Sequence, residues 1–263
     1  QGHADLGLPE TPGILAGDVA LYIFTSGTTG LPKAATYKHQ RLVTAANLLG
    51  KLTLRPKPGD RLYLCLPIYH ITCLGPGLCG FIAAGGTVCL RRTFSAGKFW
   101  SEVQAWQTNS FVYVGELCRY LVTQAPTDAE KNNPLQKMVG NGLRPDVWDE
   151  FKSRFDVDRI CEVYGSSEGN VTFLNLLNKD RTIGTTSVEV ALVKYDVNEE
   201  AIVRDDAGLC ELAKSGEPGL LLGKITDITP FDGYSRIWMP LTGHVPAGVA
   251  SPAPPRRKMQ RMK

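Results

Sequence analysis

The seven cysteines of this chain include no CxxC pair, the spacing typical of zinc sites and redox motifs. They are Cys65, Cys73, Cys79, Cys89, Cys118, Cys161 and Cys210. Their number is odd, and most stand in apolar strings such as Leu64-Cys65-Leu66. This usage favours buried, reduced thiols in an intracellular protein over a zinc site.

Acidic residues are absent from the last thirteen positions, which hold five basic residues. These are Arg256, Arg257, Lys258, Arg261 and Lys263. The chain of 263 residues has a formal net charge of +3, so the first 250 residues carry −2. A nucleic-acid-binding body is therefore not indicated. Residues 246–263 are expected to form a disordered, solvated tail, with contact to an anionic membrane surface as the alternative.

Charged residues are also absent from 62–90, a run long enough to cross a bilayer. Pro67, Pro76 and five glycines interrupt this run. The interruptions predict a buried strand–loop–helix–strand, with membrane contact as the alternative. The amino terminus begins polar and shows no signal peptide, so we expect an intracellular protein.

Strand-like and helix-like segments alternate along most of the chain. Its 43% hydrophobic and 21% charged residues are typical of a globular protein of one or two domains. Apolar runs predict strands at 19–24, 61–66, 87–90, 111–114 and 160–164, with 19–24 buried. Helical spacing and caps predict helices over 39–49, after Ser95, from Leu117 and from Pro145. The alternation predicts an α/β fold with a mainly parallel sheet, in which ligands bind beyond the carboxyl ends of strands.

After residue 175 the pattern changes to shorter strands at 188–195, 201–204 and 220–225, separated by charged and Gly-Pro turns. We therefore expect three parts in the chain. They are an α/β core over 1–175, a β-rich subdomain of the same region over 176–234, and a basic tail over 235–263.

The strongest chemical signal is a polar loop that follows the first predicted strand. It reads Thr25-Ser26-Gly27-Thr28-Thr29-Gly30-Leu31-Pro32-Lys33. Glycines expose backbone N–H groups, hydroxyls add donors and the lysine adds a mobile charge, which together suit a polyphosphate. A flexible polar turn is the alternative. The loop is not a Walker A motif, because Pro32 stands five residues after Gly27 and Ala34 follows Lys33.

Two further motifs support a nucleotide site. Tyr164-Gly165-Ser166-Ser167-Glu168 ends a predicted strand. There Tyr164 could stack on a purine, Ser167 donate to phosphate and Glu168 hold magnesium. A solvated turn with a buried tyrosine is the alternative. His70 stands in the uncharged stretch, either as a satisfied core or turn residue or as a neutral donor beside a substrate carboxylate.

Several strings together resemble one known family. They are YIFTSGTTGLPKAA, LPIYH, FSAGKFW, YVGELCRYLV, GNGLRPDVW, YGSSEGN and FDGY. The chain resembles the fatty acid transport protein/very-long-chain acyl-CoA synthetase family of the adenylate-forming superfamily over residues 8–234. The resemblance implies part of the large N-terminal domain of that fold, with parallel-rich sheets, flanking helices and a β-rich subdomain.

The activity implied by the resemblance is a two-step ligation. A fatty-acid carboxylate attacks the α-phosphate of magnesium ATP to give an acyl-adenylate and pyrophosphate. The thiol of coenzyme A then displaces AMP. Such chemistry depends on positioning and on neutralising charge at the α-phosphate rather than on a protein nucleophile.

The resemblance also implies roles for particular residues. The phosphate-binding positions are Thr25, Ser26, Gly27, Thr28, Thr29, Gly30 and Lys33, of which Thr28 and Lys33 are expected to be catalytic together with Glu168, the magnesium ligand. Gly140, Asn141 and Gly142 match the segment along the adenine, Tyr164 matches the stacking aromatic, and His70 borders the acyl pocket. Ser167 stands where the family usually has threonine, which keeps the hydroxyl.

The chain departs from the family pattern in two places. Residues 179–187 are shorter than the pattern, and 235–263 replace the expected TGD aspartate, hinge and lysine-bearing C-terminal domain. We therefore expect little or no turnover from this chain alone. The alternatives are an acyl-CoA synthetase, a non-catalytic nucleotide- or acyl-binding fragment that regulates a full-length partner, and a membrane-associated fatty-acid uptake component. The sequence leaves open the preferred acyl-chain length and whether the chain pairs into a homo-oligomer. It also leaves open the organelle, which by resemblance is the endoplasmic reticulum, the peroxisome or the plasma membrane.

Overall fold

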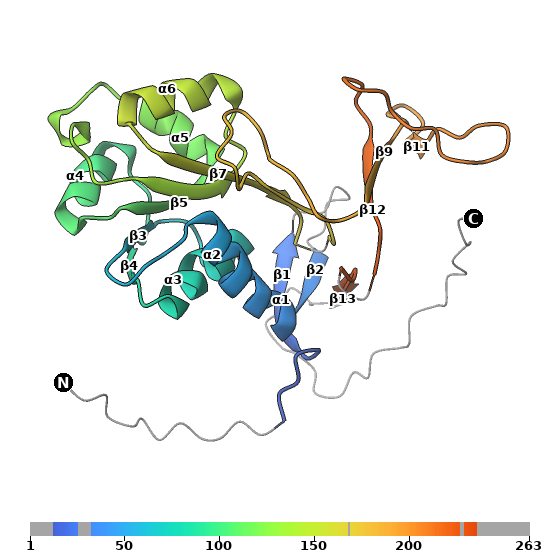
Figure 1. Cartoon of the computed structure of the whole chain (residues 1–263), viewed down its shortest axis with the longest axis horizontal. Helices are drawn as coiled ribbons and strands as arrows, with labels where there is room; N and C mark the ends of the chain where they lie inside the picture. The colour runs from blue at the N-terminus through green and yellow to red at the C-terminus, as the bar shows by residue number, and fades with distance from the viewer. Residues whose placement is uncertain (1–12, 26–32, 168, 227–228, 236–263) are drawn as a thin grey trace, which may run out of the picture.

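The computed structural model describes residues 13–25, 33–167, 169–226 and 229–235, and a six-stranded sheet lies at its centre (Figure 1). The strand order is β4-β3-β5-β6-β7-β8. The bounds are β3 Arg61–Leu64, β4 Thr87–Leu90, β5 Ser110–Val114, β6 Lys137–Asn141, β7 Arg159–Gly165 and β8 Thr172–Leu174. The first five of these strands in spatial order are parallel and β8 is antiparallel to β7. The predicted α/β fold with a mainly parallel sheet is confirmed.

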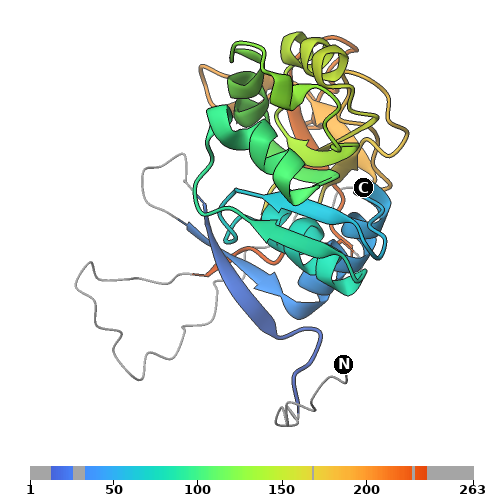
Figure 2. The same cartoon turned by 90° about the vertical axis from the view of Figure 1, so that its left-hand side faces the viewer.

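Helical segments pack on both faces of this sheet, as the two views show (Figures 1 and 2). Their bounds are α1 His39–Thr44, η1 Ala45–Leu49, α2 Gly50–Thr53, η2 Cys73–Cys79, α3 Gly80–Ala83, α4 Ala96–Trp106, α5 Gly115–Val122, η3 Asp128–Glu130 and α6 Pro145–Phe155. The predicted helices are thus all present. Ser95 is the N-cap residue of α4 as predicted, although its side chain makes no capping hydrogen bond.

Alternate residues along the strands face two separate hydrophobic layers, because successive side chains of a strand point to opposite faces. Tyr63 and Phe111 belong to the layer under α4, α5 and α6. Leu62, Leu64 and Val112 belong to the other layer, with Phe81 of α3. A sheet covered on both faces leaves its strand ends as the place where side chains reach a ligand.

The uncharged segment 62–90 folds into β3, η2, α3 and β4, the predicted strand–loop–helix–strand. Among the residues with described positions, no helix has the length and apolar character needed to cross a membrane. Burial raises the pKa of the Cys65 and Cys73 thiols to about 12. Both therefore stay protonated and unreactive at neutral pH, as the sequence predicts for buried thiols.

The first strand differs from the prediction. β1 (Val19–Thr25) was expected to be buried, but Ile23 is the one buried residue among its seven, and Tyr22 and Phe24 are 44% and 53% exposed. The prediction is wrong because β1 forms no part of the parallel sheet. It lies at the edge of a three-stranded antiparallel sheet of order β1-β2-β13, with β2 at Lys33–Lys38 and β13 at Tyr234–Ser235.

Short antiparallel pairs follow the parallel sheet and extend away from it (Figure 1). They are β9 Val190–Val193 with β12 Leu220–Gly223, and β10 Tyr195–Asp196 with β11 Ala201–Ile202. Strands are therefore present in all three segments where they were predicted. The domain boundaries at 175 and 234 stay predictions, and the tail at 236–263 lies outside the described residues.

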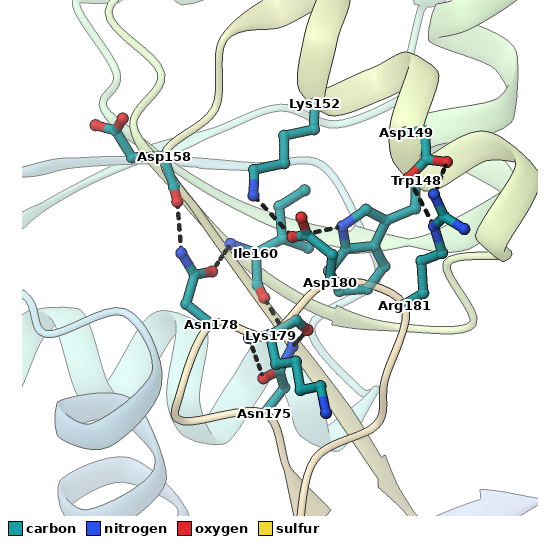
Figure 3. A network of polar contacts seen from close by, with 10 residues as sticks. All are labelled: Trp148, Asp149, Lys152, Asp158, Ile160, Asn175, Asn178, Lys179, Asp180 and Arg181. Atoms are coloured by element: carbon teal, nitrogen blue, oxygen red, sulfur yellow. Dashed lines mark hydrogen bonds and ion pairs between the residues drawn. The ribbon is translucent and has the colours of Figure 1, made fainter.

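Side chains of the loop after β8 anchor it to β7 and α6 (Figure 3). Asn178 accepts a hydrogen bond from Ile160 N at 3.0 Å, and Asn175 donates to Lys179 O at 2.7 Å. Asp180 accepts from the indole of Trp148 at 3.2 Å and from Lys152 at 2.7 Å. The segment that begins at residue 179 is thus held at its start by polar contacts, among them those of Asp180 to α6.

Candidate active site

The carboxyl ends of β6 and β7 and the β1–β2 hairpin border one cavity of about 330 Å³. Four residues singled out from the sequence line it: Thr25, His70, Asn141 and Ser167. Asn141 ends β6, Ser167 follows β7 and His70 follows β3, and these three meet because parallel strands end at one edge of the sheet. Thr25 reaches the cavity from β1 of the antiparallel sheet. The cavity is therefore the candidate ligand site.

The polar loop joins β1 to β2, and its first and last residues are described. Thr25 and Lys33 are register partners at its base, and Thr25 Oγ1 donates to Lys33 O at 3.4 Å. Lys33 Nζ lies 5.5 Å from the centre of the Tyr234 ring. The predicted phosphate-binding residues Ser26, Gly27, Thr28, Thr29 and Gly30 lie outside the described residues.

The segment Gly140-Asn141-Gly142 ends β6 beside the cavity. Gly140 has no room for a side chain, because a Cβ there would overlap the carbonyl oxygen of Tyr113 on β5. Gly142 adopts a φ of +80°, which favours glycine. Asn141 Oδ1 is buried and makes no hydrogen bond to a described residue. A buried acceptor without a partner beside a cavity is suited to a polar ligand that donates to it.

A buried carboxylate that sequence reasoning missed holds this segment in place. Glu162 of β7 is 4% exposed and accepts from Gly142 N, from Leu143 N at 3.2 Å and from the Tyr113 hydroxyl. Burial raises the pKa of Glu162, while the three donors oppose that shift. The available signal was an acidic residue within the apolar string Ile160-Cys161-Glu162-Val163, since buried glutamates are nearly always paired.

The turn after β7 presents its side chains in two directions. Ser166 and Ser167 line the candidate cavity, whereas Tyr164 lines a smaller neighbouring hollow that Ser166 also borders. Tyr164 is 49% exposed and packs edge-on against Phe173, with ring centroids 6.0 Å apart. The alternative of a buried tyrosine is therefore wrong, because β7 ends before the turn and leaves the ring at the surface. Glu168, the predicted magnesium ligand, lies outside the described residues.

Arg41 is a second residue that sequence reasoning missed, and it lines the cavity. It lies on α1, and its Nη2 donates to Gly169 O at 2.8 Å. The only sequence signal for a role of Arg41 was its position eight residues after Lys33. Spacing along a helix does not show which distant turn a side chain reaches.

His70 lies in the turn between β3 and η2 and contributes to the cavity lining. Its carbonyl accepts from Cys73 N at 2.9 Å and Leu74 N at 3.0 Å, so the residue also begins the helical segment. The core alternative is wrong, since the residue keeps an exposed side. The position of His70 agrees with the two remaining predictions, a turn residue and a neutral donor beside a substrate carboxylate.

Partial desolvation lowers the pKa of His70, which gives a testable prediction. The folded chain therefore favours the neutral imidazole. This contribution of His70 to the stability of the fold is fully present above the ordinary histidine pKa of about 6.5, and it is lost as the pH falls through the lowered pKa. An NMR titration of the His70 Cε1–H signal, assigned with His70→Gln, is expected to give a pKa below 6.5. A value at or above 6.5 would contradict the desolvated site.

Comparison with known sequences identifies the family. A profile of the AMP-binding enzyme family matches residues 3–230, most of the chain. The chain belongs to the AMP-binding enzyme family.

Named relatives of this AMP-binding chain include fatty-acid enzymes and transport proteins. It is 45% identical over 222 residues to the medium/long-chain-fatty-acid–CoA ligase FadD6 of Mycobacterium tuberculosis, covering 84% of this chain and 37% of that protein. It is 40% identical over 224 residues to human long-chain fatty acid transport protein 3, covering 83% and 32%. The chain thus spans about a third of the length of these relatives.

Solved structures confirm the fold. ATP-bound MatB from Rhodopseudomonas palustris superposes with a TM-score of 0.64 at 22% identity, covering 84% of this AMP-binding chain and 42% of that one. The N-terminal domain of FACL13 from Mycobacterium tuberculosis gives a TM-score of 0.57 at 23% identity, covering 74% and 48%. At these identities the likeness supports the architecture alone. The expectation of an adenylate-forming α/β fold is confirmed.

Proposed function

We propose that this chain carries the nucleotide-binding part of an ATP-dependent fatty-acid–CoA ligase. The supporting observation is the cavity at the carboxyl ends of β6 and β7, where Asn141 Oδ1 is buried without a partner and the turn 165–167 supplies Ser166 and Ser167. Relatives named medium/long-chain-fatty-acid–CoA ligase and long-chain fatty acid transport protein support the substrate class, a medium- to long-chain fatty acid. The latter name also supports a role linked to fatty-acid transport.

In this proposal the chain binds and orients rather than reacts. Lys33 and the loop before it hold the triphosphate, Asn141 accepts from the adenine amino group, and Ser167 donates to phosphate. Tyr164, exposed beside the turn, offers its ring face to the base. His70 borders the acyl group. The fatty-acid carboxylate attacks the α-phosphate and pyrophosphate leaves, after which the coenzyme A thiol displaces AMP.

Magnesium, when bound, neutralises the phosphate charge during this transfer. The residues with described positions contain no group of three or more His, Cys, Asp or Glu that could hold a metal. A single carboxylate together with the nucleotide phosphates is the ligand set that magnesium usually takes beside ATP. Glu168 is the residue we propose for that carboxylate.

Nucleotide binding tests the proposal directly. Titration calorimetry of this chain with magnesium and a non-hydrolysable ATP analogue is expected to show saturable binding. Asn141→Ala should weaken it about tenfold, because one hydrogen bond to the base is lost in a desolvated site. Asn178→Ala is the matched control. Asn178 bonds the backbone of Asp158 and Ile160 at the start of β7 and does not line the cavity, so this variant should leave the affinity unchanged. No saturable binding, or equal weakening by both variants, would reject the site.

Exchange of labelled pyrophosphate into ATP in the presence of palmitate separates a ligase half-reaction from nucleotide binding alone. Exchange that depends on palmitate would support adenylation by this chain. Binding without exchange would support the nucleotide-binding fragment instead. Flotation with liposomes, with and without residues 246–263, tests membrane association.

A further inference from the structure

We propose that Arg41 is a positioning residue that holds Gly169, and through it Ser166 and Ser167, in place to receive the nucleotide. This inference rests on the proposed function, because the turn matters through Ser166 and Ser167 in the cavity. Arg41 contacts the turn through a backbone carbonyl and so acts on the ligand through another segment.

Arg41 connects two halves of the candidate site that are far apart in sequence. It stands at the third position of α1, which follows β2 directly, and β2 begins at Lys33. Its Nη2 donates to Gly169 O at 2.8 Å, across 128 positions of the chain. The hairpin that carries the polar loop and the turn after β7 are thus joined by one side chain.

The orientation of the guanidinium is determined from both of its sides. Its central carbon lies 4.5 Å from the centre of the Tyr37 ring, so the planar group stacks on an aromatic face. Its Nη1 lies 3.8 Å from Asp232 Oδ2, and the Asp232 side chain is only 2% exposed. Lys38 Nζ contacts the other carboxylate oxygen of Asp232 at 2.7 Å. This arrangement leaves the guanidinium few alternative positions.

The residue after Gly169 is attached to a different element. Asn170 Nδ2 donates to Lys224 O at 2.8 Å, just beyond β12. The carboxyl-terminal end of the turn therefore has two anchors, one from α1 to Gly169 and one from Asn170 to the end of β12. Ser166 and Ser167 lie between these anchors and the end of β7, so the loss of Arg41 would release the turn on the side facing the hairpin.

Arg41 also lies in the wall between two hollows. It lines the candidate site and a neighbouring cavity of about 590 Å³, which Asp232, Asn170 and Phe231 also line. The buried Nη1 of Arg41 and Oδ2 of Asp232 make no hydrogen bond to a described residue. Their contact is therefore electrostatic, and the hydrogen bond to Gly169 is the directional link from Arg41 to the turn.

Three variants of this chain test the proposal. Arg41→Gln removes both the positive charge and the planar guanidinium. Arg41→Lys keeps the charge but loses the planar group that stacks on Tyr37. Arg159→Gln is the matched control, because Arg159 also donates to backbone carbonyls, those of Leu52, Thr53 and Leu176, but does not line the cavity. The measurements are hydrogen–deuterium exchange of peptides covering 163–172, affinity for a magnesium-bound non-hydrolysable ATP analogue, and melting temperature.

Both Arg41 variants are expected to exchange faster across 165–170 and to bind the analogue about tenfold more weakly, since a charged hydrogen bond is lost. Arg159→Gln is expected to melt at a lower temperature with unchanged exchange at the turn and unchanged affinity. Wild-type affinity in Arg41→Lys would overturn the proposal, since the arginine would then act by charge alone. Unchanged exchange at 165–170 in Arg41→Gln would also overturn it.

Failure of the proposed function gives a different result. If the wild-type chain binds no nucleotide, the affinity measurement rejects the proposed function, while the exchange measurement still decides whether Arg41 holds the turn.

Discussion

Glu162→Ala is expected to lower the free energy of unfolding by about 3–5 kcal/mol, because three donors, two of them on buried residues, lose their acceptor at about 1–3 kcal/mol for each buried group. The donors are Gly142 N, Leu143 N and the Tyr113 hydroxyl. They come from β5 and from the end of β6, so one carboxylate joins three neighbouring strands beside the cavity. Urea denaturation followed by circular dichroism measures the loss.

Two further variants show whether the network or the charge is responsible. Tyr113→Phe removes one donor and is expected to cost about 1 kcal/mol. Glu162→Gln keeps one carbonyl acceptor and should lie between Tyr113→Phe and Glu162→Ala. A loss below 1 kcal/mol for Glu162→Ala would show that the segment 140–142 does not depend on this carboxylate.

Gly115→Ala is expected to destabilise the chain by about 3 kcal/mol, the upper end of the cost of overpacking a core. Gly115 begins α5, and a Cβ there would overlap the carbonyl oxygen of Gly142 and lie 2.8 Å from Leu143 N. Relief requires α5 to move away from the end of β6. The variant should therefore also weaken nucleotide binding in the calorimetric titration.

Gly97→Ala is the matched control for this prediction. It lies in α4, where an added Cβ meets nothing within 4 Å. Alanine has the higher helix propensity, so this substitution should stabilise the chain by up to about 1 kcal/mol. Equal effects of the two substitutions on the urea midpoint would show that the close approach of Gly115 to Gly142 does not affect the free energy of unfolding.

Much of the fold followed from local patterns. The strands β4, β5 and β7 and the helices α4 and α6 were located from apolar runs, spacing and a proline at a helix start. These signals are local because a strand buried on both faces needs an unbroken apolar run, and a helix on its surface needs one apolar stripe. The family strings placed the same elements in an adenylate-forming domain.

The errors concern which segments become neighbours. The apolar run of β1 resembles a buried strand, yet its pairing with β2 places it at the edge of a separate antiparallel sheet. Nothing within 19–24 distinguishes these two environments, because both require a β-branched, aromatic-rich strand. The strand β2 was not predicted, since its short alternation follows directly on the loop.

The candidate site divides in the same way. Local patterns and the family strings singled out Thr25, Asn141 and Ser167, three polar residues at or just after strand ends that line the cavity. The hydrogen bond that Glu162 accepts from Gly142 N and the one that Arg41 donates to Gly169 O could be found in the folded chain and not from any local pattern. The physical reason is that a strand end is marked by local backbone requirements. The partner of a buried carboxylate or guanidinium depends instead on which distant backbone groups packing brings within hydrogen-bonding distance.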